Sequence, residues 1–376
     1  MAAERRHKNG PLIFLLPSLA GGGAEKTAAL LAPELARFGN LLLVLLQDRC
    51  IFPLPDHVAR IAFSPPLQGA AAHLIRLPYH VWSLVRLVRR SGAGTVLSFM
   101  EQANLVNLLA ARLTGHRAVL SQRTNPRRQY AAKGLLGRLI VRASAALYKR
   151  GEGVIAVSAG IRDILIADYG VEPERVRVIA NPVDIDTMTA QARSAPAVEP
   201  GGRFLLHVGR LDLATKRHDF LLNAFRQVQE ARPDIRLLLV GDGPDEPALR
   251  AMIAGMGLDG VVVLTGWQDN VASFMARAVA TLLCSRYEGW PNVLIEAMSV
   301  GCPVIATDCP TGPREITAGG RYGLLVPQED VAAFARACLS LIDDPLERER
   351  YAILARRRSR DFSLKAVAGQ YRHALR

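Results

Sequence analysis

Two carboxylates in the segment Ser-Arg-Tyr-Glu-Gly-Trp-Pro-Asn-Val-Leu-Ile-Glu could hold one ligand between them. Glu288 is expected in a loop that follows a strand, and Glu296 in a helix whose first residue would be Pro291. Carboxylates on a loop and on a helix can bind different hydroxyl groups of one polyol. Backbone N–H groups at the helix start can bind a phosphate, and these would belong to Asn292, Val293 and Leu294. Spacing alone leaves open the alternative of two surface glutamates.

Two cations follow another expected strand, Phe204–Val208, in the text Val-Gly-Arg-Leu-Asp-Leu-Ala-Thr-Lys. Arg210 and Lys216 would both lie at the carboxyl end of that strand, next to Gly209. Two cations suit a diphosphate, and a guanidinium can bind two oxygens at once. Gly241 follows the next expected strand and would turn at the rim of the same site. Ordinary solvated cations ahead of a helix are the alternative.

A loop of three glycines, Gly21–Gly23, separates the first expected strand from the first expected helix. Glycines let the backbone approach a ligand closely, and a helix N-terminus offers N–H groups to an anion. The loop is not a Walker A motif, because Glu25 stands before Lys26 where that motif requires glycine. A phosphate loop and a plain tight turn both fit this text.

Metal chemistry has little support in the sequence. Five scattered cysteines form no Cys-x-x-Cys, and eight histidines form no His-Glu-x-x-His, so we expect a reduced chain without structural zinc. Asp184-Ile-Asp186 matches the acidic metal motif of some sugar transferases, but it follows Asn-Pro-Val rather than a buried strand. We therefore expect neither a metal nor another cofactor.

Short apolar runs alternate with helical patterns along most of the chain, which is typical of parallel β-α-β units. The run Thr187–Arg203 lacks periodicity and is expected to be a connector. The sequence thus predicts an α/β protein with two doubly wound, Rossmann-like domains, residues 1–190 and 191–360, followed by a final helix within 361–376. Ligands of such sheets bind beyond the carboxyl ends of the strands, so the two domains are expected to face a central cleft.

The expected strands are Pro11–Leu16, Leu41–Leu46, Val58–Phe63, Thr95–Phe99, Ala118–Ser121, Val154–Val157, Val176–Ile179, Phe204–Val208, Arg236–Val240, Val261–Leu264, Ala280–Cys284 and Pro303–Ala306. The expected helices are Ala24–Phe38, Leu74–Arg90, Gln102–Leu113, Gly134–Lys149, Gly160–Tyr169, Asp219–Ala231, Glu246–Met256, Asn270–Arg277 and Pro291–Val300.

The positive charge is concentrated in one half of the chain. The whole chain of 376 residues carries a formal charge of +13, and residues 1–151 hold 21 Lys/Arg against 6 Asp/Glu. A basic half can face nucleic acid, anionic lipid or a phosphorylated substrate. No helix-turn-helix, zinc finger or aromatic-interleaved basic patch is present, so we expect no nucleic-acid partner.

Basic helices of this half suit an anionic membrane surface. In Val81–Arg90 the apolar residues share one face and the arginines the other, and Lys133–Arg150 places Arg138, Arg142 and Lys149 in line. A helix packed on its own sheet with a solvated basic face is the alternative. No run approaches the roughly 18 apolar residues of a membrane span. The apolar run Leu12–Leu16 fits a buried first strand better than a signal peptide. We therefore expect a cytoplasmic protein, peripheral on the inner face of the membrane.

Taken in order, several of these segments resemble the retaining glycosyltransferases of family 4. The matching text is Gly-Gly-Gly-Ala-Glu, Val-Gly-Arg-Leu with its lysine, Val-Gly-Asp-Gly-Pro and Glu-Gly-Trp-Pro-Asn-Val-Leu-Ile-Glu, spread over roughly residues 11–340. The resemblance implies the GT-B fold, a nucleotide-sugar donor and no metal. It also implies that the last helix, Leu364–Leu375, crosses back onto the first domain.

The resemblance assigns roles to matching residues. Glu296 would hold the nucleotide ribose, Glu288 the donor sugar hydroxyls, and Arg210 with Lys216 the diphosphate. Glu288, Arg210 and Lys216 would be the catalytic residues, while Gly209 and Gly241 would line the donor site. Gly22 and Gly23 would approach the donor phosphate from the other domain. No side chain is expected to act as a covalent nucleophile.

One departure from the family text bears on the acceptor. Many relatives carry a histidine just after the strand matching Thr95–Phe99, whereas here the text is Ser-Phe-Met-Glu-Gln-Ala-Asn. This text and Ser-Gln-Arg-Thr-Asn-Pro resemble the branch that extends lipid-linked oligosaccharides, which puts Glu101, Asn104 and Arg123 on the acceptor side. We therefore expect transfer of a hexose or N-acetylhexosamine, UDP-linked, to a lipid-linked or envelope glycan. A nucleotide-sugar 2-epimerase and a silent sugar-binding subunit are the alternatives.

Overall fold

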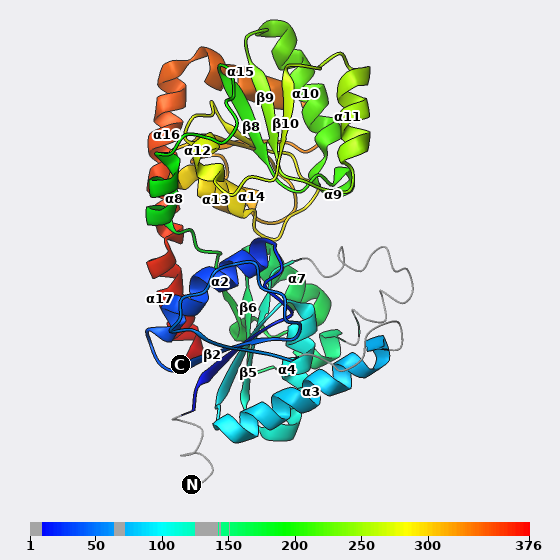
Figure 1. Ribbon diagram of the computed structural model, residues 1–376, viewed down its shortest axis with the longest axis vertical. Coiled ribbons are helices and arrows are strands. Elements are labelled where there is room, and N and C mark those ends of the chain that lie inside the picture. The colour runs from blue at the N-terminus through cyan, green and yellow to red at the C-terminus, as the bar shows by residue number, and fades with distance from the viewer. Residues whose placement is uncertain (1–9, 64–71, 125–141, 143, 150) are drawn as a thin grey trace. The chain divides into compact units, whose positions relative to one another are not determined.

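The computed structural model describes residues 10–63, 72–124, 142, 144–149 and 151–376 (Figure 1). The chain divides into two compact units, the first made of Met1–Pro182 with Leu364–Arg376 and the second of Val183–Ser363. The predicted boundary at residue 190 falls inside helix α8 (Ile185–Ala192), whereas the chain changes unit at Pro182 and again at Ser363.

Unit 1 is built on seven parallel strands in the order β3-β2-β1-β4-β5-β6-β7. The strands are β1 (Leu12–Leu16), β2 (Leu41–Leu45), β3 (Ala59–Ala62), β4 (Thr95–Phe99), β5 (Arg117–Gln122), β6 (Gly153–Ala156) and β7 (Val176–Val178). The helices are α2 (Gly23–Ala36), α3 (Ala72–Ser91), α4 (Glu101–Thr114), α7 (Ala159–Tyr169), the short 3-10 helix η2 (Pro173–Arg175) and α17 (Leu364–Leu375).

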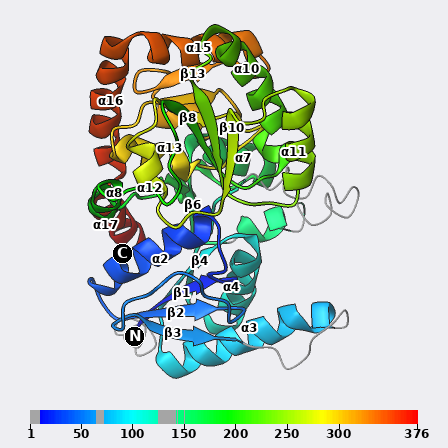
Figure 2. The same ribbon diagram turned by 45° about the horizontal axis from the view of Figure 1, so that its top comes forward.

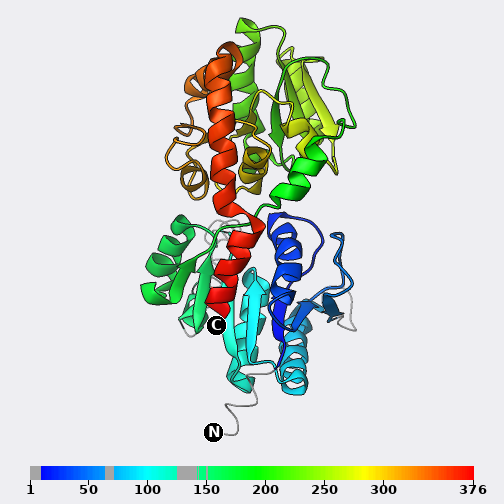
Figure 3. The same cartoon turned by 90° about the vertical axis from the view of Figure 1, so that its left-hand side faces the viewer.

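The central strands of this sheet are buried on both faces, which explains why β1 and β2 are continuous apolar runs. Successive side chains of β1 point to opposite faces, so Phe14 joins one core cluster and Ile13 another. On the Phe14 face, α17 packs against α2 and contributes Tyr371 to the core. Figure 3 shows α17, in red, beside the blue α2.

Unit 2 has six parallel strands in the order β10-β9-β8-β11-β12-β13. The strands are β8 (Phe204–Val208), β9 (Arg236–Val240), β10 (Val262–Gly266), β11 (Thr281–Leu283), β12 (Val304–Thr307) and β13 (Leu324–Val326). The helices are α8, α9 (Leu213–Lys216), α10 (His218–Ala231), α11 (Glu246–Gly255), α12 (Val271–Met275), α13 (Asn292–Ser299), α14 (Pro313–Ile316), α15 (Val331–Asp343), α16 (Pro345–Ser359) and the 3-10 helix η3 (Arg360–Phe362). In Figure 2, α10 and α11 lie on one side of β8 and β10, and α12 and α13 on the other.

The two sheets share one feature that positions functional loops. The strand order reverses between β1 and β4 in unit 1, and between β8 and β11 in unit 2. In open parallel sheets, loops at the carboxyl ends of such neighbouring strands form the ligand site. The segments that follow β8 and β11 carry Arg210, Lys216 and Glu288, and those that follow β1 and β4 carry Gly22, Gly23 and Glu101.

The predicted connector Thr187–Arg203 is wrong at its start, because α8 extends to Ala192. Asp184 is the N-cap of this helix, and its carboxylate accepts a hydrogen bond from the backbone N–H of Thr187 at 3.1 Å. The Asp-Ile-Asp text therefore begins a helix, for which an N-cap aspartate and an acidic first turn are the favoured residues.

Candidate functional site

Lys216 and Glu288 form an ion pair at the strand reversal of unit 2. The ammonium nitrogen of Lys216 lies 2.6 Å from Oε1 of Glu288, and the Ser285 hydroxyl donates to the same oxygen at 2.7 Å. Their side chains are 22% and 13% exposed. Burial opposes the charge on Lys216, but the charge and hydrogen bond of Glu288 outweigh it and raise the pKa of Lys216. The site thus holds a fixed cation beside a carboxylate with two donors.

Backbone hydrogen bonds fix the loops on which this pair stands. The Asp212 carboxylate caps α9 by accepting from the backbone N–H of Thr215 at 3.0 Å. The backbone N–H of Arg286 donates to the Thr215 carbonyl at 2.8 Å, which ties the loop after β11 to the segment after β8. The Thr311 hydroxyl donates to the Glu288 carbonyl. Hydrogen bonds between the segment after β8 and the loop after β11 therefore hold Lys216 close to Glu288. Arg210 lies six residues before Lys216 in the chain, and its side chain is exposed.

Gly209 and Gly241 lie against each other at the ends of β8 and β9. Gly241 has a φ of +133°, and a Cβ on it would lie 2.1 Å from the Gly209 carbonyl oxygen. Any side chain at Gly241 would push these two loops apart. Their predicted contact with a donor stays a prediction, but the need for glycine at 241 has a structural cause.

Helix α13 begins one residue later than predicted, with Pro291 as its N-cap. The backbone N–H of Leu294, predicted to bind phosphate, donates to the Pro291 carbonyl at 3.1 Å. Asn292, Val293 and Glu296 are half-buried on this helix.

Two buried histidines next to Lys216 escaped the sequence analysis. His207 Nδ1 lies 3.0 Å from the Leu282 carbonyl oxygen, and the rings of His207 and His218 meet edge to face at 4.9 Å. Burial, with the positive charge of Lys216 adding to it, lowers the pKa of His207 to about 3 and that of His218 to about 4. Both rings are therefore neutral at physiological pH. His207 lies in the expected strand Phe204–Val208, but the sequence pattern does not distinguish a buried ring from an exposed one.

In unit 1, Gly22 is the N-cap of α2 with a φ of +144°. A Cβ there would lie 2.5 Å from the Glu25 carboxylate, so the side chain of Glu25 folds back over the glycine loop. Burial raises the pKa of Glu25, against the effect of a backbone hydrogen bond. Gly23 is the first residue of the same helix.

The three predicted acceptor residues lie in the interior of unit 1. Glu101 is buried, and burial raises its pKa, while hydrogen bonds from Ser144 and Tyr148 oppose the rise. Asn104 has no exposed surface and donates to the hydroxyl oxygen of Tyr148 at 2.7 Å.

Arg123 is also buried. Its guanidinium donates to the Tyr371 hydroxyl at 2.8 Å, bonds the Asn181 side chain and stacks over the Phe99 ring. The structure thus gives Asn104 and Arg123 internal partners, and their place on the acceptor side stays a prediction.

Helix α3, which was expected to face a membrane, packs its apolar side into the core of unit 1. Leu84, Val85 and Val88 of α3 are buried in the core of unit 1, so the packed-helix alternative describes that face. The outer side shows Trp82, 55% exposed, with the Arg86 guanidinium 5.2 Å from its ring centroid. Of the second basic segment, Arg138 lies outside the described residues, and Arg142 and Lys149 are exposed.

Among the residues that the structure describes, no group of three or more His, Cys, Asp or Glu side chains could hold a metal ion. Within the same part of the chain, no helix is long and apolar enough to cross a membrane.

Two family models match this chain. The model described as "Glycosyltransferase Family 4" matches residues 21–187, and the one described as "Glycosyl transferases group 1" matches residues 202–344. The first covers unit 1 from α2 to β7 together with the start of α8, and the second covers the segments that carry Lys216 and Glu288.

Curated relatives extend the match to nearly the whole chain. A Campylobacter jejuni enzyme, N-acetylgalactosamine-N,N'-diacetylbacillosaminyl-diphospho-undecaprenol 4-alpha-N-acetylgalactosaminyltransferase, is 27% identical over 93% of this chain and 95% of its own. The phosphatidyl-myo-inositol mannosyltransferase of Mycobacterium leprae is 29% identical over 93% of this chain and 91% of its own.

A solved structure shows the same fold. Anabaena HepE, crystallised in complex with UDP and glucose, superposes with a TM-score of 0.81 at 21% identity, covering 96% of this chain and 98% of HepE. The two parallel-sheet α/β units are thus those of GT-B glycosyltransferases. Matched by both family models and by full-length relatives, this chain belongs to the group 1 glycosyltransferases of family 4.

Proposed function

We propose that the protein transfers a hexose or N-acetylhexosamine from a UDP-linked donor to a lipid-linked or cell-envelope glycan, with retention and without a metal. The observation that carries this proposal is the Lys216–Glu288 pair at the strand reversal of unit 2. A cation held there suits the diphosphate of a nucleotide sugar, and a carboxylate beside it suits sugar hydroxyls.

The names of the relatives support the substrate classes. The Campylobacter jejuni relative is named for a diphospho-undecaprenol-linked substrate, and the Mycobacterium leprae relative for phosphatidyl-myo-inositol. The HepE structure contains UDP and glucose. The two curated names support a lipid-linked acceptor, and the HepE structure supports a UDP-linked donor.

In the proposed reaction the bond between the sugar anomeric carbon and the diphosphate breaks, and the acceptor oxygen bonds to that carbon on the same face. The acceptor proton passes to the leaving phosphate, so no covalent sugar-enzyme intermediate forms. Negative charge grows on the leaving diphosphate, where Lys216 and Arg210 would stabilise it without reorganising. Glu288 would orient the sugar through its hydroxyl groups.

The test is release of free nucleotide from UDP-, GDP- and ADP-sugars, each with and without a membrane lipid extract, and with EDTA in a parallel series. Release from the UDP-sugar alone, increased by lipid, unaffected by EDTA and lost in Glu288→Ala, is expected. NMR of the product should show the anomeric configuration of the donor. A sugar trapped on Glu288 or loss of activity in EDTA would contradict the mechanism.

Two other results would replace the proposal. Conversion of the donor into its 2-epimer without transfer would identify an epimerase. If no nucleotide is released from any sugar donor, and no nucleotide raises the Tm, the protein would be a catalytically inactive binding subunit.

We also propose that the outer side of α3 meets an anionic membrane surface on the cytoplasmic face. Trp82 is the kind of side chain that settles at a membrane interface, and Arg86, Arg89 and Arg90 add charge on the same helix. Each cation near such a surface contributes about 1 kcal/mol.

A further inference from the structure

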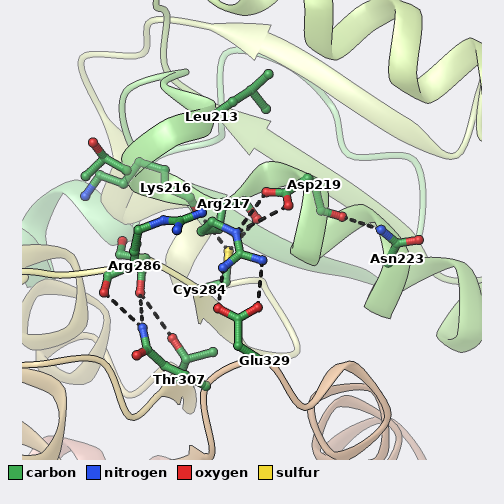
Figure 4. A network of polar contacts seen from close by, with 12 residues as sticks. Leu213, Lys216, Arg217, Asp219, Asn223, Cys284, Arg286, Thr307 and Glu329 are labelled. Carbon is green, nitrogen blue, oxygen red and sulfur yellow. Dashed lines mark hydrogen bonds and ion pairs between the residues drawn. The ribbon is translucent and has the colours of Figure 1, made fainter.

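Arg217, the residue after Lys216, makes a forked ion pair that no sequence motif indicated. Its two terminal nitrogens donate to the two carboxylate oxygens of Glu329 at 2.6 and 3.0 Å, and its Nε donates to Asp219 at 3.2 Å (Figure 4). Only 12% of the Arg217 side chain is exposed. A guanidinium held in this way has its orientation fixed by two separate segments of chain.

The residue before Glu329 reaches the loop that carries Glu288. Gln328 Nε2 donates to the carbonyl oxygens of Ser285 and Arg286 at 3.3 and 2.9 Å. The loop between β13 and α15 therefore holds the segment after β8 through Glu329, and the loop after β11 through Gln328. Figure 4 shows Arg217, Arg286 and Glu329 gathered around this junction.

The segments held in this way are those that carry the Lys216–Glu288 pair. Ser285 donates its hydroxyl to Glu288 at 2.7 Å, and its carbonyl is one of the two that Gln328 holds. The Cys284 thiol lies 3.1 Å from the Lys216 carbonyl oxygen. A shift of the β13–α15 loop would thus be passed to both members of the pair.

The backbone at both ends of the ion pair takes a form that disfavours side chains. Arg217 has a φ of +56° and Glu329 a φ of +68°. Glycine would take both positions without this cost, and strained non-glycine residues cluster at functional sites. Arg217 and Glu329, the two residues with this unfavourable backbone conformation, are also the two that form the ion pair.

We infer that Arg217, Gln328 and Glu329 form a clamp that positions Lys216 for the diphosphate and Glu288 for the sugar of the nucleotide-sugar donor. The inference rests on the proposed function. Arg217 is a positioning residue, because its guanidinium is engaged by Glu329 and Asp219.

The test compares Glu329→Ala with Asp343→Ala, a matched control in the same unit. Asp343 forms the same kind of forked pair, with Arg232 at 2.6 and 2.7 Å, between the ends of α10 and α15. Arg217→Lys is the third variant, since it keeps the charge and loses the fork. The measurements are the Tm, the Kd for UDP, donor KM and kcat, and hydrogen exchange of residues 213–218 and 285–289.

Glu329→Ala and Arg217→Lys are expected to raise the UDP Kd and donor KM roughly tenfold, and to speed exchange in both segments. Asp343→Ala should leave the UDP Kd, the donor KM and the exchange of both segments within experimental error. Its Tm should change by no less than that of Glu329→Ala. Equal losses in Asp343→Ala, or an unchanged Kd in Glu329→Ala, would overturn the clamp.

The proposed function and the clamp can fail separately. If the unaltered protein neither binds UDP nor releases nucleotide, the proposed function fails, and unchanged exchange in Glu329→Ala still overturns the clamp. If the unaltered protein binds UDP and Glu329→Ala binds it equally well, only the clamp fails.

Discussion

Lys216 and Glu288 follow two hydrogen-bonded neighbouring strands, and their side chains meet at 2.6 Å. The cation suited to a diphosphate and the carboxylate suited to a sugar therefore neutralise each other in this structure. Neither group has to be desolvated alone, which lowers the cost of keeping both in a half-buried site.

Lys216→Met should distinguish what the Lys216–Glu288 pair contributes to the stability of unit 2 from what it contributes to nucleotide release. The variant leaves the Glu288 carboxylate unpaired, which should cost about 2 kcal/mol of unfolding free energy, and it should abolish nucleotide release. The double variant Lys216→Met/Glu288→Gln should recover most of the stability, because no unpaired charge remains, but none of the activity. Urea unfolding in a Trp82→Phe background checks this, since the remaining tryptophans, Trp267 and Trp290, lie in unit 2. Recovered activity in the double variant would show that the pair is dispensable.

Gly241→Ala should damage unit 2, because the added methyl would lie 2.1 Å from the Gly209 carbonyl oxygen. We expect a loss of roughly 2 kcal/mol or more together with weaker UDP binding. Gly255→Ala is the control, since it ends helix α11 with open space around a new Cβ, and it should be neutral or stabilising by a few tenths of a kcal/mol. The same urea titration measures the stability of each variant, and isothermal titration calorimetry measures its affinity for UDP. Equal stabilities of the two variants would contradict the packing argument.

His207 and His218 should make unit 2 less stable as the pH falls below about 6.5. Their folded pKa values of about 3 and about 4 lie below the ordinary 6.5, so between those values the unfolded chain binds protons that the folded chain does not. Each histidine then removes up to about 1.4 kcal/mol of stability for each pH unit. Unfolding free energies at pH 5, 6 and 7.5 should show a shallower slope in His218→Asn. His57→Asn, a substitution in unit 1, should leave the slope of unit 2 unchanged.

Glu101→Gln should stabilise unit 1 at neutral pH. Burial raises the pKa of Glu101, so the folded chain holds the proton more tightly than the unfolded chain, and stability is lost as the pH rises through the folded pKa. The amide removes that loss, so the gain in Tm should be present at pH 8 and absent at pH 4. If Glu101 also serves the acceptor, nucleotide release should fall while the Tm rises. A Tm gain of the same size at both pH values would exclude the titration as its cause.

Trp82→Ala should weaken binding to anionic vesicles. The substitution removes the exposed ring that lies beside Arg86, while the buried face of α3 stays unchanged. Co-sedimentation with phosphatidylserine vesicles at low and at 0.5 M salt checks this, because surface charge attraction is screened by salt. Trp267→Ala, at a tryptophan of similar exposure in unit 2, is the control and should bind as the unaltered protein does. Equal losses in both variants would place the contact elsewhere.

Periodicity was a good guide where strands are buried on both faces. The predictions Thr95–Phe99, Phe204–Val208 and Arg236–Val240 match β4, β8 and β9 residue for residue, because such strands are short apolar runs between polar turns. Helix α8 was missed because a single buried residue, Met188, leaves almost no apolar pattern to read.

The candidate site was predictable only in part. Spacing and resemblance selected Lys216 and Glu288, since both follow strands that were expected from the sequence. The interior positions of Asn104 and Arg123 depend on Tyr148 and Tyr371, which come from distant parts of the chain. The Arg217–Glu329 pair joins residues 112 positions apart, a separation that local patterns do not register.

The return of α17 to unit 1 has a consequence for synthesis on the ribosome. Val183–Ser363 is one uninterrupted stretch, whereas unit 1 needs Tyr371 to complete its core beside Phe99. The stretch before residue 183 must therefore wait for α17 until unit 2 has been made. Part of the apolar core of unit 1 thus stays uncovered while unit 2 is synthesised, and exposed apolar surface of this kind is what aggregates or binds chaperones.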